Sequence, residues 1–492
     1  MRSTANAGGC YRIPAPPRDE RPARSAPPVA AAGGCYHIPA PPRDGWPSVA
    51  AGPADLEPED VAACAPTASR TELPRVDRAL FRPSGGCGFI SEFVACGMAD
   101  ALHPNEPLLF LSALAACATL AGQGFRTDRN AWPNQYVVGV APTSTGKDAG
   151  QKLAAHLLAR LGVGDRIGGR PGSGPALQDF LLLAGVKLFN SDECADLFKN
   201  LHAKGNGEPA GASLNAQLLA AWSASAGVYH RRQLKPDPKA AKVPASGWNL
   251  QATFCGWAQP GAFFDALSPD DLASGLLGRC LVLEGDPLSL NESGANLYAP
   301  TDALLDWGRR ILDSGGRATF TGEDRPAPLV VSPADASAAG YRLDLLRKET
   351  KMRLDFETQG DHAAAAAYGK TFEKAEKFAL LYAVAENPET PALTVAGYEW
   401  AWRLVTSSTA ALFERVRHLV ARTDHERNVN RVLALLRERG GSVPVRELCR
   451  KFKDLKPADL QSALETLRNG ELAEVRIVRT RTNPRKDLVL LG

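Results

Sequence analysis

The residues with the clearest potential for chemistry lie at positions 142–148. They directly follow the apolar run 136–141 and directly precede a helical pattern that continues to Leu161. A loop between a buried strand and a helix can bind phosphate with its backbone amides and the positive end of the helix, while a lysine reaches the β- and γ-phosphates. Gly146 and Lys147 supply these two residue types, so we predict an ATP site. The predicted nucleotide-binding residues are Pro142, Thr143, Ser144, Thr145, Gly146, Lys147, Asp148 and Gln259.

Two positions of this segment depart from the usual phosphate-loop pattern. Ala141 stands where glycine is preferred, and Asp148 stands where a serine or threonine hydroxyl binds Mg²⁺. A carboxylate is a good hard ligand for Mg²⁺, but it also brings negative charge close to the β-phosphate. We predict Asp148 as a Mg²⁺ ligand. The alternative is an ordinary strand-to-helix turn with a solvated lysine.

An acidic pair follows a second apolar run. Residues 186–191 have the composition of a buried strand, and Asp192 and Glu193 come next. In ATPases, acids at such a position hold Mg²⁺ and orient the attacking water. We predict that Asp192 shares the metal ion with Asp148 and that Glu193 positions the water as a catalytic residue. The alternative is an acidic helix start, which the helix dipole favours by itself.

Two further positions could complete the site. The run 250–255 is expected to end at the sheet edge where ligands of open α/β folds bind, so Gln259 or Thr253 could sense the γ-phosphate. Capping of the next helix explains Gln259 equally well. Arg279 opens the run 280–284 and is predicted as a catalytic arginine finger that reaches a neighbouring subunit. A structural ion pair is the competing interpretation.

These chemical residues need a sheet to position them. The four apolar runs alternate with helical patterns, which is the βαβ rhythm of a doubly wound, mostly parallel sheet. Residues 90–122 have helical periodicity with a break at Pro104 and precede the first strand. Residues 334–420 are mostly helical and predict a bundle beside the sheet, with long helices over 363–385 and 398–416. The predicted fold class is therefore α/β.

The C-terminal segment, residues 425–492, reads as a separate basic unit. It carries 15 Lys or Arg against 9 Asp or Glu, a balance of +6. Three helices followed by two strands, with a basic turn at 480–486, give the order of a winged helix, so we predict DNA binding. Protein docking or a solubilising face are the alternatives. The predicted DNA-binding residues here are Lys456, Arg468, Arg479, Arg481, Arg485 and Lys486.

A basic insert at 230–242 interrupts the strand and helix rhythm. Arg231, Arg232 and Lys235 are predicted to follow a nucleic-acid backbone as a pore loop, whereas a solvated surface loop is the alternative.

The N-terminal segment repeats itself and is rich in proline. Residues 8–19 recur with few changes at 33–44, and 14 of the 37 prolines fall within the first 74 residues. Proline removes backbone donors and favours an extended chain, so residues 1–74 are predicted to be a disordered tail. The repeat is either a duplicated motif for a replication partner or a local duplication in a linker.

Length and composition exclude several classes of protein. A chain of 492 residues exceeds one hydrophobic core, so we expect two to four folded units. The 44% hydrophobic and 23% charged residues exclude a fully disordered or fibrous chain. No apolar stretch reaches the roughly 18 residues of a membrane span, and no secretion signal begins the chain, so a cytoplasmic location is expected. The ten cysteines include no C-x-x-C pair and are predicted to be free and mostly buried.

Several of these motifs occur together and in order. They are the helices around Pro104, the Ala-Pro-Thr-x-x-Gly-Lys loop, Ser191-Asp192-Glu193, Gln259-Pro260, and Gly-Leu-Leu-Gly-Arg ending at Arg279. Over residues 89–416 the chain resembles a family of phage, plasmid and genomic-island P-loop proteins. That family, long catalogued as a domain of unknown function, is often fused to primase modules as replicative helicase-like ATPases. The resemblance implies a RecA-like or AAA+-like core that forms a ring and acts on DNA.

We therefore predict five parts: a tail (1–74), N-terminal helices (75–132), a P-loop NTPase core (133–288), a helical domain (289–424) and a winged helix (425–492). The predicted function is that of an ATP- and Mg²⁺-dependent replication protein of a phage or mobile element, a ring-forming helicase or helicase-like initiator. Its predicted partners are further copies of itself and single-stranded, forked or origin duplex DNA. The alternatives are a nucleotide-switch helicase loader and a DNA-binding adaptor with a degenerate ATP site.

Overall fold

The structure is a computed structural model of the whole chain, and it divides into two units, residues 1–67 and 68–492. It describes residues 76–86, 88–201, 210–231, 243–267, 271, 275–315, 320–322, 326–419, 424–453, 455–470, 472–478 and 485–491. All of these belong to the second unit. The predicted disordered tail, residues 1–74, lies outside the described residues, and so do Arg232, Lys235, Arg479 and Arg481.

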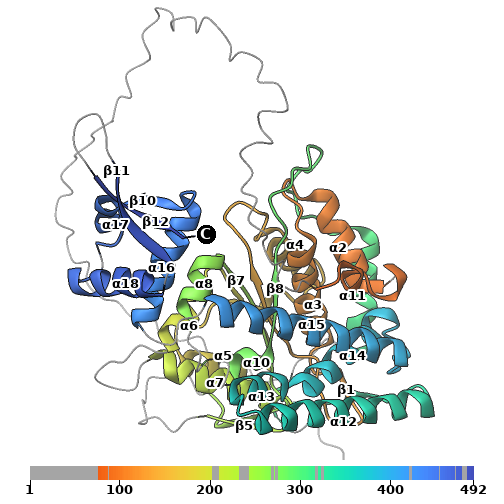
Figure 1. Cartoon of the computed structure of the whole chain (residues 1–492). Helices are drawn as coiled ribbons and strands as arrows, with labels where there is room; N and C mark the ends of the chain where they lie inside the picture. The colour runs from red at the N-terminus through yellow and green to blue at the C-terminus, as the bar shows by residue number, and fades with distance from the viewer. Residues whose placement is uncertain are drawn as a thin grey trace, which may run out of the picture. The chain divides into compact units, whose positions relative to one another are not determined.

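A five-stranded sheet forms the centre of the fold, and every neighbouring pair in it is parallel (Figure 1). The strand order is β3-β4-β7-β2-β8. The prediction of a mixed α/β fold with a parallel sheet is confirmed, and the four apolar runs are its four longer strands. Strand β3, at one edge of the sheet, has only three residues, two of which are glycine, and it was not predicted. The bounds are β2 Tyr136–Val140, β3 Ile167–Gly169, β4 Val186–Ser191, β7 Gln251–Ala258 and β8 Cys280–Glu284.

Helices cover both faces of this sheet. Val137 of β2 packs into one hydrophobic cluster, whereas Tyr136 and Val138 pack into the other. Strands buried on both faces favour continuous apolar runs, which is why they are visible in the sequence. Helices of the Val137 face are α2 Gly88–Asp100, α3 Glu106–Ala121, α4 Ala149–Arg160, α11 Asp302–Gly315 and α14 Thr371–Glu386. Helices of the other face are α5 Gly174–Ala184, α6 Ala195–Leu201, α7 Ala210–Ala224, α8 Pro260–Ala266, α10 Leu276–Arg279 and α13 His362–Tyr368.

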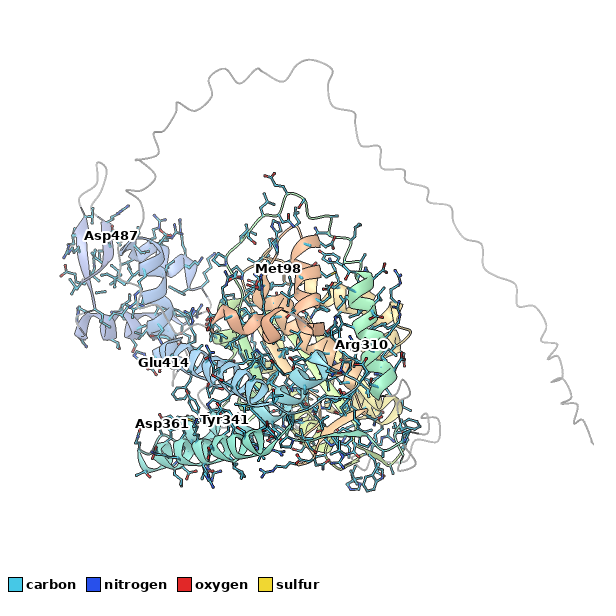
Figure 2. All side chains as sticks on the ribbon, turned by 90° about the vertical axis from the view of Figure 1, so that its right-hand side faces the viewer. Met98, Arg310, Tyr341, Asp361, Glu414 and Asp487 are labelled. Carbon is cyan, nitrogen blue, oxygen red and sulfur yellow. The ribbon has the colours of Figure 1, made fainter. Side chains whose placement is uncertain are left out.

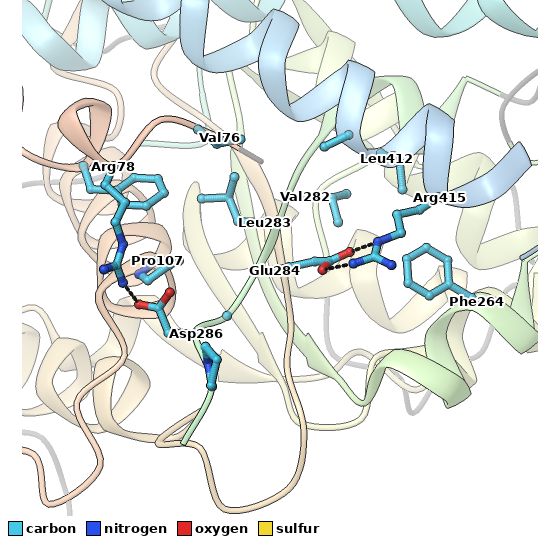
Figure 3. Close-up of a pocket in the computed structure, with 14 residues that line it drawn as sticks. Val76, Arg78, Pro107, Phe264, Val282, Leu283, Glu284, Asp286, Leu412 and Arg415 are labelled. Atoms are coloured by element: carbon cyan, nitrogen blue, oxygen red, sulfur yellow. Dashed lines mark hydrogen bonds and ion pairs between the residues drawn. The ribbon is translucent and has the colours of Figure 1, made fainter. Parts of the chain in front are cut away.

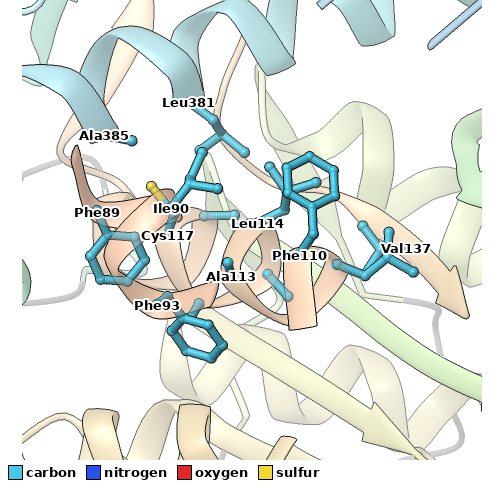
Figure 4. Close-up of a cluster of buried hydrophobic side chains, with 14 of the residues drawn as sticks. Phe89, Ile90, Phe93, Phe110, Ala113, Leu114, Cys117, Val137, Leu381 and Ala385 are labelled. Carbon is cyan, nitrogen blue, oxygen red and sulfur yellow. The ribbon is translucent and has the colours of Figure 1, made fainter. Parts of the chain in front are cut away.

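Helix α3 is the most deeply buried element beside the sheet, since all 16 of its residues are buried. Figure 4 shows Phe110 and Leu114 of α3 beside Leu381 of α14, in the same cluster as Val137. The sheet and this layer are tightly fitted, because a side chain on Gly139 of β2 would come within 2.2 Å of the Trp257 ring. Truncating a phenylalanine such as Phe110 to alanine in so dense a core costs about 3–5 kcal/mol. The predicted helices on either side of Pro104 are confirmed as α2 and α3.

The edge strand β8 is covered by a long helix, α15 Val395–Leu419. The hydroxyl of Ser408 in α15 donates to the carbonyl of Val282 (2.8 Å) and accepts from its amide (3.1 Å). An uncovered edge strand presents unpaired backbone groups that favour aggregation, so this contact completes the sheet edge. The helix predicted over 363–385 is two helices, α13 and α14, separated at Gly369 and Lys370. Helix α12, Ala336–Thr358, packs against both α13 and α15.

Two small sheets lie outside the central one. β1 Phe125–Thr127 pairs in parallel with β9 Leu329–Val331, and β5 Val228–His230 pairs antiparallel with β6 Ser246–Trp248. The remaining short elements are η1 Arg78–Phe81, η2 Pro83–Gly86 and η3 Gly164–Arg166.

The C-terminal residues have a hydrophobic core of their own, which includes Val432, Leu448 and Leu488. Three helices and a three-stranded antiparallel sheet of order β10-β12-β11 surround it. Strand β10 was not predicted, because it is only three residues long. The bounds are α16 Asp424–Glu438, β10 Ser442–Pro444, α17 Val445–Lys451, α18 Pro457–Asn469, β11 Ala473–Val478 and β12 Arg485–Leu490. In the part of the chain that the structure describes, no helix has the length and apolar character needed to cross a bilayer.

Candidate functional site

The loop after β2 has a tightly turned backbone. Ser144 (φ 64°) and Gly146 (φ 75°) both adopt the left-handed conformation, which is uncommon for serine. The side chain of Thr145 is buried and donates to the carbonyl of Pro142 at 2.8 Å. Helix α4 then begins directly after Asp148. The loop therefore folds back on itself and leads without a spacer into the amino end of a helix.

Residues at the start of α3, and just before it, fix the position of the loop. Asn105, at the start of α3 and only 1% exposed, donates from Nδ2 to the carbonyls of Thr145 (3.1 Å) and Asp286 (3.2 Å). Its Oδ1 accepts from the amide of Asp286 at 3.1 Å. A side chain at Gly146 would come within 1.9 Å of the carbonyl of His103, so this position requires glycine. Asn105 was not predicted, although its place between Pro104 and a long apolar helix was a usable signal.

The predicted acids meet the loop at the carboxyl edge of the sheet. Because β2, β4 and β7 are parallel and adjacent, the loops that follow β2 and β4 leave the same edge. Lys147 Nζ and Glu193 Oε1 lie 3.9 Å apart, with the lysine side chain 15% exposed and the glutamate 52% exposed. Glu193 is also in the left-handed conformation (φ 53°). Such backbone strain concentrates at functional sites, and here the following amide, that of Cys194, is fixed by the carbonyl of Trp257 at 2.7 Å.

Asp148 already has a partner. Its carboxylate forms an ion pair of 2.5 Å with Lys152, one turn along α4, and both side chains are 51% exposed. The hydrogen bond that the Lys152 ammonium donates to the Asp148 carboxylate raises the pKa of Lys152, and the negative charge of Asp192 adds to the same shift. Both predicted Mg²⁺ ligands therefore favour the charged form of Lys152.

These two carboxylates would be a sparse protein ligand set for a metal. The described residues contain no group of three or more His, Cys, Asp or Glu side chains that could hold a metal ion. Mg²⁺ is usually bound by one or two carboxylates together with water and substrate phosphates, so the residues present fit a nucleotide-borne Mg²⁺ better than a resident metal.

Gln259 and Thr253, the two predicted γ-phosphate sensors, lie in different places. Gln259 is exposed and directly follows β7, whose last residue, Ala258, is in register with Val140 at the end of β2. The prediction for Thr253 is wrong. It is the third of eight residues of β7 and 2% exposed, because the strand continues through Trp257 instead of ending at Cys255.

Arg279 lies at the opposite edge of the sheet. It is the last residue of α10 and precedes Cys280, which is in register with Tyr136 at the amino end of β2. Its Nη1 donates to the carbonyl of Gly275 at 2.8 Å, while its buried Nε has no hydrogen-bond partner among the described residues. The length of β2 therefore separates Arg279 from Lys147 of the same chain, and its predicted role at a neighbouring subunit's site stays a prediction.

Two cavities lie near the loop. One, of about 400 Å³, is bordered by Ser144, Gly146, Asp148 and Lys152 on the loop side. The other, of about 410 Å³, lies at the carboxyl end of β8 and is lined mainly by apolar side chains (Figure 3). The charged side chains in this second cavity pair with one another, Glu284 with Arg415 (2.5 Å) and Arg78 with Asp286. Of these two cavities, only the first is lined by residues of the loop itself.

Burial disfavours the thiolate form of the cysteines near the sheet. Burial raises the pKa of Cys255 to about 12 and raises that of Cys194 well above its ordinary value. The described free cysteines are all buried except Cys449, which confirms the prediction of mostly buried thiols for these positions.

The predicted DNA-binding residues are dispersed. Arg231 forms a bidentate ion pair with Asp179 (2.9 and 3.2 Å), so its charge is already partnered. Lys456 and Arg468 are exposed at the two ends of α18, but α18 also carries Asp459 and Glu465.

The basic turn predicted at 480–486 is shorter than expected. Arg485 and Lys486 belong to β12, and Arg485 binds the buried Asp487 at 2.9 Å (Asp487 is labelled in Figure 2). Helix α17 carries three further exposed cations, Arg446, Arg450 and Lys451, which were not predicted as DNA contacts. Counting charge for each helix, instead of assuming the usual recognition helix, would have indicated them.

No protein-family model matches the sequence, and a search of curated proteins finds no match. The resemblance to phage and plasmid P-loop proteins stays a prediction from the motifs. The contacts of Lys147, Asp148 and Glu193 are therefore the basis for a functional proposal.

Proposed function

We propose that this chain is an ATP-hydrolysing enzyme with a P-loop NTPase core at residues 133–288. The observation that carries the proposal is the contact between Lys147 and Glu193 at the carboxyl edge of three adjacent parallel strands. Open α/β sheets bind ligands at this edge. The strand between β2 and β4 is β7, so the loop, the acids and Gln259 come from three neighbouring strand ends.

The ion pair gives a simple account of how the site would be used. The γ-phosphate competes for Lys147, and Glu193 is then released to orient a water molecule for attack. Mg²⁺ arriving with ATP would be held by Asp148 and Asp192, neutralising charge on the β- and γ-phosphates. Lys152 offsets the charge that Asp148 brings to the loop, since the two already form an ion pair.

DNA binding and ring assembly are part of the same proposal. The order of elements in the C-terminal residues, with two antiparallel strands after α18, is typical of a winged helix, and exposed cations on α17 and at Lys486 support contact with phosphate. In a ring, a neighbouring copy would have to face the amino edge of the sheet to receive Arg279. The protein would then act as a replicative helicase or helicase-like initiator of a mobile element.

A second candidate is a nucleotide-switch loader that binds ATP and hydrolyses it slowly. Asp148 favours it, because a carboxylate tied to Lys152 replaces the hydroxyl that usually binds Mg²⁺.

ATP turnover by the full chain, with and without single-stranded and forked DNA, tests the proposal. Lys147→Ala should reduce turnover by at least 100-fold, because the loop loses its β/γ-phosphate contact, while Lys351→Ala, at an exposed position of α12, serves as the matched control. DNA-stimulated turnover that is lost only in Lys147→Ala supports a motor. Tight ATP binding with negligible turnover supports the loader, and a wild-type chain that does not bind ATP overturns the proposal.

A further inference from the structure

The cavity beside the loop is also lined by distant parts of the chain. Ser144, Asp148 and Lys152 line it from the loop and α4, and His103 and Tyr298 line it from other segments. Its volume of about 400 Å³ lies in the range of small-molecule sites. A phosphate loop and an aromatic side chain therefore border one cavity.

Tyr298 is held in an unusual conformation. Its φ of 52° is in the left-handed region, where a bulky residue is a genuine outlier. The carboxylate of Asp100 accepts from its amide (2.5 Å), and Nδ1 of His156 bonds to its carbonyl (3.0 Å). Backbone in such a conformation persists only where the surroundings over-determine it, and it clusters at ligand clamps.

The ring of Tyr298 is also oriented. Its hydroxyl donates to Oδ1 of Asn296 at 3.0 Å, and the ammonium of Lys152 lies 5.1 Å from the ring centroid. Asn296 shares the left-handed conformation (φ 52°), and its Oδ1 also accepts from the amide of Leu102 at 2.8 Å. The aromatic ring is thus fixed beside the lysine that binds Asp148.

Polar groups of the cavity remain available to a ligand. Nδ1 of His103 bonds to the carbonyl of Ser289 at 2.8 Å, which leaves Nε2. Over the described ranges, neither Nε2 of His103 nor Nδ2 of Asn296 has a hydrogen-bond partner. Both side chains line the cavity, so an aromatic surface and two polar groups are presented together.

We infer that this cavity is the base and ribose subsite of the nucleotide whose phosphates occupy the loop, with the base stacked on Tyr298. The inference rests on the proposed function, since it assumes that the loop binds phosphate. Stacking of bases on aromatic side chains is a common source of nucleotide affinity. The polar groups of His103 and Asn296 would then contact the edge of the base or the ribose hydroxyls.

Calorimetry with Mg²⁺-ATP and with Mg²⁺-tripolyphosphate, which lacks a base, tests the subsite. We expect Tyr298→Ala to weaken ATP binding at least tenfold and to leave tripolyphosphate binding unchanged, whereas Tyr298→Phe keeps most of the ATP affinity. Tyr341→Ala is the matched control, because Tyr341 (labelled in Figure 2) also has a lysine, Lys348, over its ring, at 5.7 Å. Lys147→Ala should weaken both ligands.

The outcomes separate the two proposals. If the wild-type chain binds neither ligand, the proposed function is wrong. If the wild-type chain binds both and Tyr298→Ala binds ATP as tightly as before, or loses both ligands equally, the subsite is wrong. Circular dichroism checks folding, and if Tyr298→Ala does not fold, His103→Ala takes its place with the same expected loss of ATP over tripolyphosphate.

Discussion

Charged side chains differ between the two edges of the central sheet, the carboxyl edge and the amino edge at which its parallel strands end and begin. At the carboxyl edge, Lys147, Glu193 and Asp148 form long or solvent-exposed pairs that a ligand can exchange. At the amino edge, Lys374 and Lys377 of α14 are 1% and 3% exposed and bind protein groups only. The first arrangement keeps the charged groups available to a ligand. The second buries two lysines, which lowers the stability of the folded state. A buried charge with a shifted pKa therefore does not by itself identify the edge at which a ligand would bind.

The amino-edge lysines show why. Burial lowers the pKa of Lys374 to about 8 and that of Lys377 to about 7. Lys377 donates to Oδ1 of Asn134 (2.5 Å) and lies 4.2 Å from the ring centroid of Trp222, whose indole in turn donates to Glu373. Each contact is internal to the protein, so this edge looks structural even though its pKa values are the more strongly shifted.

Among the substitutions that test the difference between the two edges, Glu193→Gln is expected to have the largest effect on ATP turnover. Loss of the carboxylate that orients water should lower ATP turnover by roughly 10²–10⁴-fold. Binding of ATP should be kept or tightened, because Lys147 no longer has an ionic partner. Single-turnover hydrolysis together with calorimetry measures the two quantities separately. Asp196→Asn, on the exposed side of α6, is the control. Equal losses of turnover and affinity would remove Glu193 from the catalytic role.

An intermediate effect is expected at the amino edge, as a dependence of stability on pH. In the unfolded chain both lysines have the ordinary pKa of about 10.4 and bind more protons than in the folded chain. The free energy of unfolding should therefore rise as pH increases from 7 to 8.5, by up to about 1.4 kcal/mol per pH unit for each lysine. Above pH 9 the trend should reverse, because burial raises the pKa of thiols such as Cys255 and Cys280 to about 12.

Lys377→Met is the variant that checks this prediction by urea unfolding at several pH values. It should flatten the rise between pH 7 and 8.5 and leave ATP affinity unchanged. Lys351→Met, at an exposed site, should keep the wild-type slope. A wild-type stability that falls over this pH window would contradict the structural assignment of the amino edge.

The smallest effect is expected for Asp148→Ser. The substitution restores the usual Mg²⁺-binding hydroxyl and frees Lys152, so the Mg²⁺ concentration for half-maximal ATP turnover should change by less than tenfold. Gln151→Ser, at the neighbouring half-buried position of α4, controls for the helix. A loss of turnover as large as that of Glu193→Gln would instead make Asp148 an indispensable ligand.

Local patterns made much of the molecule predictable. Strands buried on both faces favour apolar residues, so β2, β4, β7 and β8 were recognised from their composition. The phosphate-loop motif and the acidic pair each occupy a few consecutive residues, and their conformation follows from the strand before them. The positive φ of Gly146 belongs to the turn itself, whereas the space for a side chain there is limited by the distant carbonyl of His103.

Contacts between distant segments escaped prediction. Asn105, which holds the loop, and Tyr298, which borders the cavity, lie in segments without a chemical motif. Thr253 was placed wrongly because strand length depends on the helices that bury β7, not on its own residues. Arg279 follows a recognisable motif, but its position at the amino edge depends on the direction of β8 in the sheet.

The sequence by itself therefore determined the four longer strands of the central sheet and the acids that follow one of them, since these depend on neighbours along the chain. Only the tertiary structure decided that Lys147 meets Glu193, that Arg279 lies at the other edge, and that Tyr298 shares a cavity with the loop. The physical reason is that strand order and helix packing arise from burial between residues far apart in sequence, which no local spacing encodes.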